Sequence, residues 1–499
     1  MVQSRRNLLI LLYLKISQLH PMHTDTQAQR VLRIMCTSML LALSACGGSG
    51  GGGVEPAVTG PGYFDPPFAN ANSLQEQCTG LAPKKFIRAY LDENYLWPEK
   101  VQRRDALAYN TAADYFEAIL APPPTDRFSF SSPIDDADAR ETAQAFDVGI
   151  HWVNAGSSQA PLWRVARVEP GSPASASGIR RGDTLFGQLS TNLYSSTTQT
   201  LFYNFSYLRN GQLLQANLRP ATIFEDPVGP AIVLNANARK IGYVGFESHY
   251  GNAQDQLIES LESLSRQGIQ ELVLDLRYNS GGYLYIASTL ASMLTPLQAL
   301  QNGPEFIRLQ PNAKLTDSYQ NAALRMAPFV VYEGDNAVYR AGSTLPRLAV
   351  KRVYVLTTGA TCSASESLIN GLRGVGVTVH TIGDTTCGKP YGMTRQDNCG
   401  TAYYPIEFRG VNALGESDFA NGFSPTCSVP DDLDHVRGDS QEAQLKAALT
   451  HMSTGVCPAS DLVAARSAAN AQMSPRPLGS GYTPPQRLRP GLAILQPAH

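Results

Sequence analysis

Thr361-Cys362-Ser363-Ala364-Ser365-Glu366 follows the strand-like run Val353-Tyr354-Val355-Leu356 and leads into a stretch that reads as a helix as far as Leu372. A strand, a turn and a helix in this order, repeated from Lys240 onward, predict an α/β fold. The turn puts the hydroxyl of Ser363 at the start of a helix. A serine there is often only a cap, because its oxygen can accept hydrogen bonds from the first backbone N–H groups. Ser363 alone is therefore ambiguous.

A lysine follows in Gly383-Asp384-Thr385-Thr386-Cys387-Gly388-Lys389, 26 positions after the serine (389 − 363). A serine is a weak nucleophile until a base takes its proton, and a lysine can do so if burial lowers its pKa. Serine–lysine pairs are a known variant of the serine-hydrolase arrangement. The two motifs together predict Ser363 as a nucleophile and Lys389 as its general base.

A glycine pair follows an earlier strand. Leu272-Val273-Leu274-Asp275-Leu276 is short and apolar, as is typical of a buried parallel strand, and it continues into Arg277-Tyr278-Asn279-Ser280-Gly281-Gly282. Glycine lets the backbone approach a substrate closely, and acyl transfer needs backbone N–H groups aimed at the developing oxyanion. We expect Gly281 and Gly282 to supply such donors, with the N–H of Ala364 as another.

Short strands fill the middle of the chain. The run 163–168 alternates in the strand period, and 169–183 reads as a turn, a small-residue helix and a Gly-x-x-x-Gly-Asp sequence. This segment resembles a PDZ domain, with Asp147-Val148-Gly149-Ile150 where that family has its carboxylate-binding loop. The resemblance implies that Val148, Gly149 and Ile150 bind the C-terminus of a peptide, which adds as a strand. A PDZ fold that acts only as a spacer is the alternative.

Together these blocks resemble the C-terminal-processing, or tail-specific, serine peptidases. The resemblance covers about Gln75 to Met452 and rests on three motifs, at 275–282, 361–366 and 383–389. It implies an α/β fold with a crotonase- or ClpP-like protease core, preceded by a mostly β PDZ domain and a small helical N-terminal region. By position, it also makes Ser363 the nucleophile and Lys389 the general base.

One position departs from the family pattern. The better-known members carry a glutamine four residues after the lysine, where this chain has Met393. Either another group must therefore position Lys389, or its positioning is looser. His249, after the first core strand, is a candidate, although a lone histidine is usually structural. We therefore expect a dyad and not a triad.

The N-terminus has the features of an export signal. Arg30 and Arg33 precede an apolar run from Ile34 to Leu43, which is too short to span a membrane. The sequence Leu43-Ser44-Ala45-Cys46 then resembles a bacterial lipobox, which implies cleavage before Cys46 and lipidation of its thiol. Gly47 is not the aspartate that usually signals inner-membrane retention, so we expect the outer membrane, facing the periplasm. The alternative is an ordinary cleavage site with a chance cysteine.

Six cysteines remain after Cys36 and Cys46 are set aside. An even number in an exported chain suggests disulfides, although sequence alone leaves fifteen pairings open. We expect Cys387–Cys399, because a polar turn at 395–398 can fold the chain back, and Cys427–Cys457 as a second pair. The sequence has no C-x-x-C pair and no H-E-x-x-H, so we expect no metal and no cofactor.

The charge and the sequence patterns indicate which partners and which domains to expect. The formal net charge is −2, which gives no reason to expect a nucleic-acid partner. We expect six segments: a signal with lipobox (1–46), a glycine-rich flexible tether (47–74), a helical domain (75–138), a PDZ domain (139–226), a serine peptidase core (227–456) and a disordered tail (457–499).

The leading functional hypothesis is an exported, lipid-anchored serine endopeptidase that acts on proteins or peptides and recognises their C-termini. The main alternative is a non-catalytic peptide- or ligand-binding protein on the same fold. A pure PDZ scaffold is a third reading. The presence of both Ser363 and Lys389 argues against a non-catalytic binding protein, and the length of the core argues against a pure PDZ scaffold.

Overall fold

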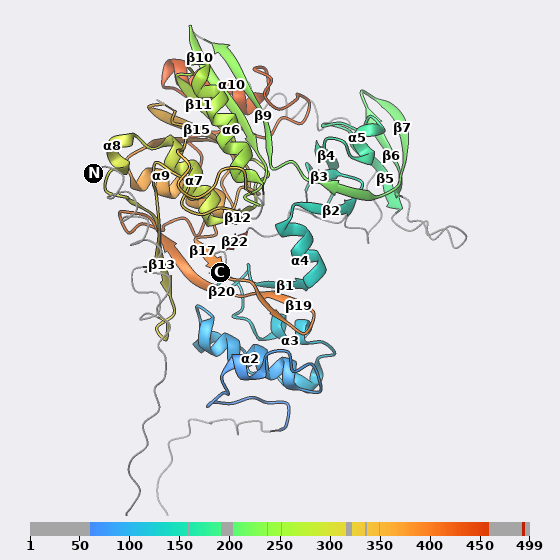
Figure 1. Ribbon diagram of the computed structural model, residues 1–499. Helices are drawn as coiled ribbons and strands as arrows, with labels where there is room; N and C mark the ends of the chain where they lie inside the picture. The colour runs from blue at the N-terminus through green and yellow to red at the C-terminus, as the bar shows by residue number, and fades with distance from the viewer. Residues whose placement is uncertain are drawn as a thin grey trace, which may run out of the picture. The chain divides into compact units, whose positions relative to one another are not determined.

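The computed structural model describes residues 60–157, 159–190, 203–236, 238–250, 252–315, 322–334, 337–348, 350–458 and 492–494 (Figure 1). Apart from Gly60, these residues belong to one compact unit, Pro61–Gln496. Cys46, the signal segment and the glycine tract lie outside the described residues. Within the described ranges, no helix is long and apolar enough to cross a membrane.

Helices dominate the N-terminal region. Helix α2 (Ala82–Asn94) has Pro83 in its first turn and buries Phe86, Ile87 and Leu91 along one face. Helix α3 (Ala112–Ile119) begins with a capping box, in which Thr111 and Asp114 satisfy each other's backbone N–H groups. The short 3-10 turns are η1 (Ala71–Leu74), η2 (Pro98–Lys100) and η3 (Ala106–Ala108).

The expected flexible tether ends earlier than the sequence predicted. Residues 61–74 fall within the segment assigned to the tether, but Phe64 and Phe68 pack on the main hydrophobic core and Ala71 is fully buried. Arg103 also forms an ion pair with Asp65. The expected tether was extended to residue 74 because of the glycine tract at its start. The aromatic residues after that tract provide apolar area that is more stable when buried.

A small antiparallel β unit follows. Its five strands run in the order β3-β4-β5-β6-β7, around a separate hydrophobic cluster that includes Val165, Ile179 and Leu185. Strands β2 and β8 pair at the two ends of the unit. The elements are β1 (Phe130–Pro133), α4 (Ile134–Glu141), β2 (Gln144–Asp147), β3 (Ile150–Asn154), β4 (Trp163–Val168), α5 (Pro173–Ala176), β5 (Thr184–Ser190), β6 (Tyr203–Arg209), β7 (Gln212–Leu218) and β8 (Ala221–Phe224).

The core is built on a six-stranded sheet with the order β21-β16-β15-β11-β10-β9. Strands β10, β11, β15, β16 and β21 are parallel, and β9 is antiparallel. All five residues of β11 are buried, as expected for a parallel strand covered on both faces. These strands are β9 (Val228–Ala236), β10 (Arg239–Phe246), β11 (Glu271–Asp275), β15 (Arg352–Thr357), β16 (Thr378–Gly383) and β21 (Cys427–Ser428).

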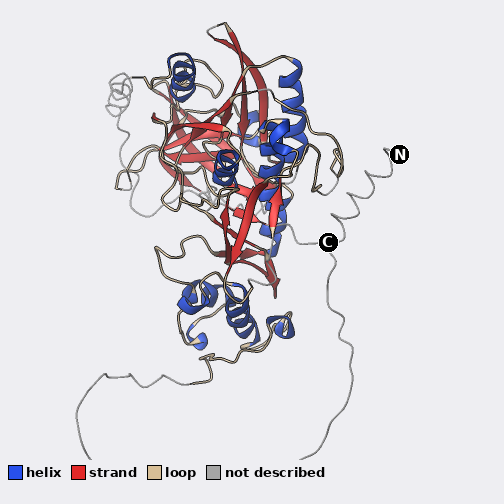
Figure 2. Ribbon diagram, turned by 90° about the vertical axis from the view of Figure 1, so that its left-hand side faces the viewer, coloured by secondary structure: helices blue, strands red, loops and turns tan. Residues whose placement is uncertain are grey.

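Helices lie on both sides of the strands (Figure 2). Helix α6 (Ala253–Arg266) packs on α7 (Leu284–Leu294), and α7 packs on α9 (Ala364–Gly374). Helix α10 (Ala443–Thr454) packs against β15 and β16 within a different hydrophobic cluster. A short helix, α8 (Leu297–Leu300), follows α7. This layered arrangement of helices around a mostly parallel sheet is the α/β core that the sequence predicted.

A second, mixed sheet has the order β12-β22-β17-β20-β13-β14, and a third has the order β1-β19-β18. Strand β22 (Leu492–Ile494) lies in the segment that we expected to be disordered, and its pairing on both sides contradicts that expectation for these three residues. The other strands are β12 (Gly281–Tyr283), β13 (Glu305–Pro311), β14 (Ala323–Arg325), β17 (Tyr391–Met393), β18 (Gln396–Asn398), β19 (Thr401–Tyr404) and β20 (Ile406–Val411).

Candidate active site

Ser363 lies in a sharp turn between β15 and α9. Its backbone has φ 59° and ψ −111°, a region that residues with a side chain rarely occupy. Such strain is maintained only where the surroundings over-determine it, and a strand–turn–helix serine of this kind is the geometry of a nucleophile elbow. Ser363 is fully buried, and its Oγ has no hydrogen-bond partner among the described residues. The hydroxyl is therefore not used as a helix cap.

Helix α9 begins at Ala364, directly after the serine. The first N–H groups of a helix have no partner within the helix, and they carry the positive end of its dipole. An oxyanion that forms on a carbon bonded to Ser363 Oγ would develop beside these N–H groups. The position of Ala364 therefore suits the donor role that the sequence predicted for it.

Lys389 is fully buried and follows the turn after β16. Burial lowers its pKa to about 7, although the charges of Asp126 and Glu366 act in the opposite direction. Its Nζ lies 3.9 Å from the sulfur of Met393 and 5.4 Å from the centre of the Phe128 ring. A large fraction of Lys389 is thus neutral near pH 7, which is the state that a general base requires.

Glu366 joins the serine turn to the lysine turn. Its Oε2 accepts the backbone N–H groups of Ser363 (3.0 Å) and Lys389 (2.8 Å). Its Oε1 accepts the N–H of Gly388 (2.8 Å) and the hydroxyl of Thr386 (2.5 Å). Burial raises the pKa of Glu366, and these hydrogen bonds oppose that rise. One buried carboxylate therefore fixes both loops through their backbones.

A disulfide joins the same two loops. Cys362, next to Ser363, is bonded to Cys387, two residues before Lys389, with their Cα atoms 5.2 Å apart. The expected pairing of Cys387 with Cys399 is wrong, because Cys399 is bonded to Cys78 of the N-terminal region, 321 positions away. A polar turn at 395–398 indicates only which residues close in sequence can approach one another, whereas Cys78 comes from a distant segment of the chain. Cys427 is bonded to Cys457, which is the second pair that we expected.

The glycine pair is held against this site by backbone contacts. Asn279 O accepts the N–H of Cys362 (3.1 Å) and the hydroxyl of Ser365 (3.0 Å). The N–H of Gly281 donates to Asn279 Oδ1 (3.0 Å), so the expectation that Gly281 supplies a free oxyanion donor is wrong. Gly282 has φ +138°, and a Cβ there would lie 2.4 Å from the backbone oxygen of His249. Only glycine fits that position.

His249 supports the glycine turn. Its backbone N–H donates to Gly281 O (2.9 Å), its backbone oxygen accepts from Tyr283 N–H (2.7 Å), and its Nδ1 lies 3.0 Å from Asn279 Oδ1. Burial lowers its pKa to about 3, so its ring is neutral. These contacts run to the glycine turn and fit the structural role that a lone histidine usually has. The thioether of Met393, and not an imidazole, lies against Lys389 Nζ.

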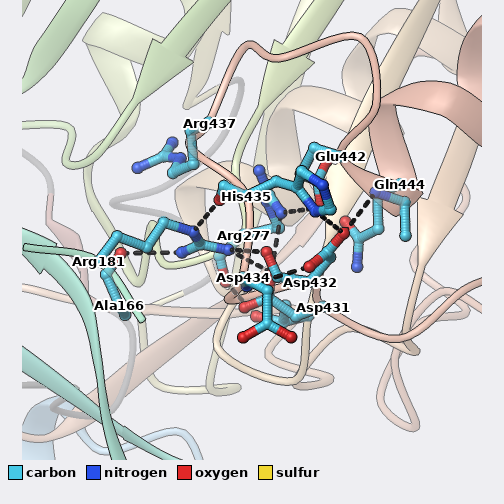
Figure 3. Close-up of polar contacts among 12 residues, drawn as sticks. Ala166, Arg181, Arg277, Asp431, Asp432, Asp434, His435, Arg437, Glu442 and Gln444 are labelled. Atoms are coloured by element: carbon cyan, nitrogen blue, oxygen red, sulfur yellow. Dashed lines mark hydrogen bonds and ion pairs between the residues drawn. The ribbon is translucent and has the colours of Figure 1, made fainter. Parts of the chain in front are cut away.

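Buried charges anchor the loop between β11 and β12. Arg277 is fully buried, and its guanidinium binds Asp275 (2.7 Å), Asp431 (2.8 Å) and Glu442 (2.8 Å). Burial alone would raise the pKa of Asp275, but the guanidinium groups of Arg277 and Arg437 hold it well below its usual range. Arg181 of the β unit reaches the same Asp431 carboxylate at 2.7 Å (Figure 3). One carboxylate therefore connects the β unit to the loop that carries the glycine pair.

The loop expected to bind a peptide carboxylate has a different arrangement. The N–H groups of Val148 and Gly149 both donate to Oδ1 of Asp147, the second at 3.2 Å. The aspartate that precedes these two amides thus supplies a carboxylate to them, and the binding of a peptide C-terminus by Val148, Gly149 and Ile150 stays a prediction. Ile150 begins β3, which is an edge strand of the five-stranded sheet.

A pocket of about 350 Å³ opens between the β unit and the core. It is lined by residues of both parts, including Trp152, Arg167, Tyr250, Tyr278 and Ser280. Ser280 immediately precedes the glycine pair, so the pocket adjoins the candidate site from the side of the β unit.

Several residues of the site were missed in the sequence. Phe128 lies over Lys389, and Arg127 donates to the backbone oxygen of Cys387 (2.9 Å), although both precede those partners by about 260 positions. Nothing in the local pattern of residues 126–128 signals this contact. Glu366, by contrast, follows Ser363 by three positions, which is the spacing of a capping box and was a readable signal.

Two family models match this chain. Residues 240–400 match Peptidase family S41, and residues 82–130 match the Peptidase S41 N-terminal domain. The first match contains the glycine turn, Ser363 and Lys389. Two segments of the chain thus match S41 peptidase domains, and the class of protein that these matches indicate is a serine peptidase, as the sequence motifs predicted.

The individual relatives are more distant. A carboxyl-terminal-processing protease of Picosynechococcus sp. (strain ATCC 27264 / PCC 7002 / PR-6) is 26% identical over 235 residues, which is 44% of this chain and 49% of that protein. The chain thus matches about half the length of this curated relative. A protein of Bacteroides fragilis NCTC 9343 assigned to the S41 proteases has a TM-score of 0.57 at 24% identity, covering 74% of this chain and 97% of that one. That likeness shows the fold. A photosystem II D1 C-terminal processing protease has a TM-score of 0.43 at 19% identity, over 70% of this chain and 92% of its own.

Proposed function

We propose that this chain is a serine endopeptidase in which Ser363 attacks a peptide carbonyl and Lys389 is the general base. One observation carries the proposal: a strained, buried serine is tied through Glu366 to a buried lysine whose pKa is lowered to about 7. A lysine of ordinary pKa would be charged at neutral pH and could not accept a proton. The S41 domain over residues 240–400 supports the same reading.

The proposed reaction has two halves. In the first, neutral Lys389 Nζ takes the proton of Ser363 Oγ as Oγ bonds to the carbonyl carbon, and the negative charge on the carbonyl oxygen faces the N–H of Ala364. The ammonium then gives its proton to the leaving amine as the C–N bond breaks, which leaves an ester on Ser363. In the second half, a water gives a proton to Lys389 as its oxygen bonds to the ester carbon. The C–Oγ bond then breaks, Oγ takes the proton back from Lys389, and the acid is released.

The wider role is part of the proposal. The β unit is a PDZ-like domain that selects protein or peptide C-termini, and the pocket beside Ser280 leads from it toward the glycine turn. Because Val148 and Gly149 already donate to Asp147, a peptide carboxylate would have to displace that side chain. The lipobox-like Cys46 makes the enzyme a lipoprotein of the outer membrane, facing the periplasm. A binding protein without catalysis on the same fold is the alternative.

The test compares purified wild type with Ser363→Ala, Lys389→Ala and the double variant on periplasmic extract, read out by terminal-peptide mass spectrometry. Residues that act as a unit give non-additive losses, so each single variant should lose cleavage and the double variant should be little worse. Ser367→Ala, one turn further along α9, is the matched control and should keep the wild-type peptide pattern. Cleavage by Lys389→Ala at near wild-type rates would refute the dyad, and identical peptide patterns in all variants would favour the binding protein.

A further inference from the structure

The glycine turn and the lysine turn each lead into a strand of the mixed sheet. Strand β12 contains Gly281 and Gly282 themselves, and β17 begins two residues after Lys389. These two strands are not neighbours, because β22 (Leu492–Ile494) lies between them (Figure 1). The two elements that flank the candidate site are thus joined by three residues from the far end of the chain.

The pairing of β22 is specific on both sides. It runs parallel to β12, with Leu492 opposite Gly281, Ala493 opposite Gly282 and Ile494 opposite Tyr283. It also runs parallel to β17, where Ile494 lies opposite Met393, the residue whose sulfur contacts Lys389 Nζ. The backbone of 492–494 therefore passes between the glycine pair and the segment that carries the base.

An extended peptide chain in this place has the position that a substrate needs. A scissile carbonyl must lie within reach of the nucleophile, the base and backbone donors, and an extended chain paired on both edges is fixed there by main-chain hydrogen bonds. Gly282 has no side chain, so a neighbouring backbone can approach it closely. The sequence 491–495, Gly-Leu-Ala-Ile-Leu, is apolar within a stretch otherwise rich in Pro, Ser and Arg.

We propose that residues 492–494 occupy, in cis, the place of a peptide substrate between β12 and β17, so that the chain carries its own competing ligand. The proposal rests on the endopeptidase function above. A segment on the same chain binds intramolecularly, so that it competes with free peptides without having to be present at a high concentration of its own. Incoming peptides must therefore displace β22 before they reach Ser363.

The test uses the Ser363→Ala protein, which cannot cut its own tail. Because the N–H groups of Gly281 and Tyr283 already donate to Asn279 and His249, hydrogen exchange is followed at the amide of Gly282 in the full chain, in a form ending at residue 458, and in Ala493→Pro. Because β22 lies between β12 and β17, a proline at its middle position is strongly disfavoured, as it is within any strand that is not at the edge of a sheet. Ala471→Pro places the same change in the same tail outside β22 and is the matched control.

We expect protection of the Gly282 amide in the full chain and in Ala471→Pro, its loss in the truncated form and in Ala493→Pro, and its return when a synthetic peptide of residues 486–499 is added. With active enzyme, truncation should lower KM for a reporter peptide by about tenfold at unchanged kcat, and the synthetic peptide should then inhibit competitively. Equal exchange in all four proteins, with no inhibition by the peptide, would overturn the inference.

The two proposals can fail separately. If the active truncated form cleaves peptides but the Gly282 amide is not protected in the full chain, the endopeptidase function stands and the cis occupancy is wrong. If protection behaves as expected but no form cleaves any peptide, the occupancy stands and the endopeptidase function is wrong. Loss of residues from the tail of wild type but not of Ser363→Ala, by intact mass, would support both.

Discussion

Ser363 and Lys389 are bridged by a single atom: Glu366 Oε2 accepts the backbone N–H of Ser363 at 3.0 Å and that of Lys389 at 2.8 Å. The link uses the backbone of both residues and neither side chain. It therefore fixes the two loops relative to one another through main-chain groups alone. The disulfide between Cys362 and Cys387 repeats the same connection through covalent bonds.

Glu366→Gln should damage activity and stability together. An amide NH₂ in place of one oxygen would face two donors, either those of Ser363 and Lys389 or those of Thr386 and Gly388. Each buried donor left unpaired costs about 1–3 kcal/mol, and we expect kcat to fall more than KM changes. Denaturant unfolding and steady-state kinetics measure both. Thr386→Ser keeps the hydroxyl and should behave as wild type; unchanged kcat in Glu366→Gln would remove Glu366 from the positioning role.

The Cys362–Cys387 disulfide should matter for catalysis, whereas Cys427–Cys457 should matter for stability alone. The two bonds close loops of similar length, 25 and 30 residues, so each stabilises the fold by about 3–4 kcal/mol in the chain-entropy model. Replacing both cysteines of either pair with alanine should therefore lower stability comparably. Only loss of the first pair should also lower kcat, because it frees the serine and lysine loops. Equal kcat in the two double variants would contradict this.

Activity should depend on pH through Lys389. Its pKa is about 7, so kcat/KM should rise through pH 7 and level off above it as the amine loses its proton. Asp126→Asn removes a charge that raises this pKa and should move the rise to lower pH. A profile that is flat between pH 6 and 8, or a shift of the opposite sign in Asp126→Asn, would contradict the assignment of the base.

The same lysine should make stability depend on pH. Its folded pKa lies below its ordinary value of 10.5, so the unfolded chain binds more protons between pH 7 and 10.5, and the contribution to stability is lost as pH falls through this window. Lys389→Met removes the titration. The free energy of unfolding of Lys389→Met, minus that of wild type, should increase by up to about 5 kcal/mol as pH falls from 10.5 to 7. If the free energies of unfolding of the two proteins change with pH in parallel over that range, the pKa of Lys389 is not lowered in the folded state.

Arg277→Met should lower the free energy of unfolding by about 3–5 kcal/mol, because it removes the arginine that three buried carboxylates share. Glu442 loses its ion pair, and Asp275 and Asp431 keep only their ion pairs with Arg437 and Arg181. Arg266→Gln is the control. It breaks only the exposed pair with Glu262 and should change stability by less than about 1 kcal/mol. Chemical denaturation of both variants distinguishes the two cases, and equal small losses would mean that the buried cluster contributes little.

Cys46→Ser should release the protein from the membrane fraction if Cys46, in its lipobox-like sequence, is the lipid anchor that we propose. Fractionation and the intact mass of the mature protein measure this. Ser44→Thr, within the same segment, leaves the cysteine in place and is the control. Membrane attachment of Cys46→Ser without any lipid on wild type would show that the anchor was misassigned.

Local sequence patterns were enough to predict the elements of the core and the class of the protein. Apolar runs predicted the buried strands β11 and β15, and the strand–turn–helix pattern placed Ser363 at the start of α9. The S41 domain confirms the class that the motifs indicated. These features depend on periodicity and on short spacings, which a single chain displays directly.

Long-range partners were decided by the tertiary structure. Cys399 pairs with Cys78 and not with Cys387, the amide of Gly281 is taken by Asn279, Phe128 lies over Lys389, and residues 492–494 form a strand between β12 and β17. Each of these facts depends on which segments the fold brings side by side. Sequence determined the chemical groups and their local conformation; the packing of distant segments decided which groups meet, because contact depends on position in space and not on separation along the chain.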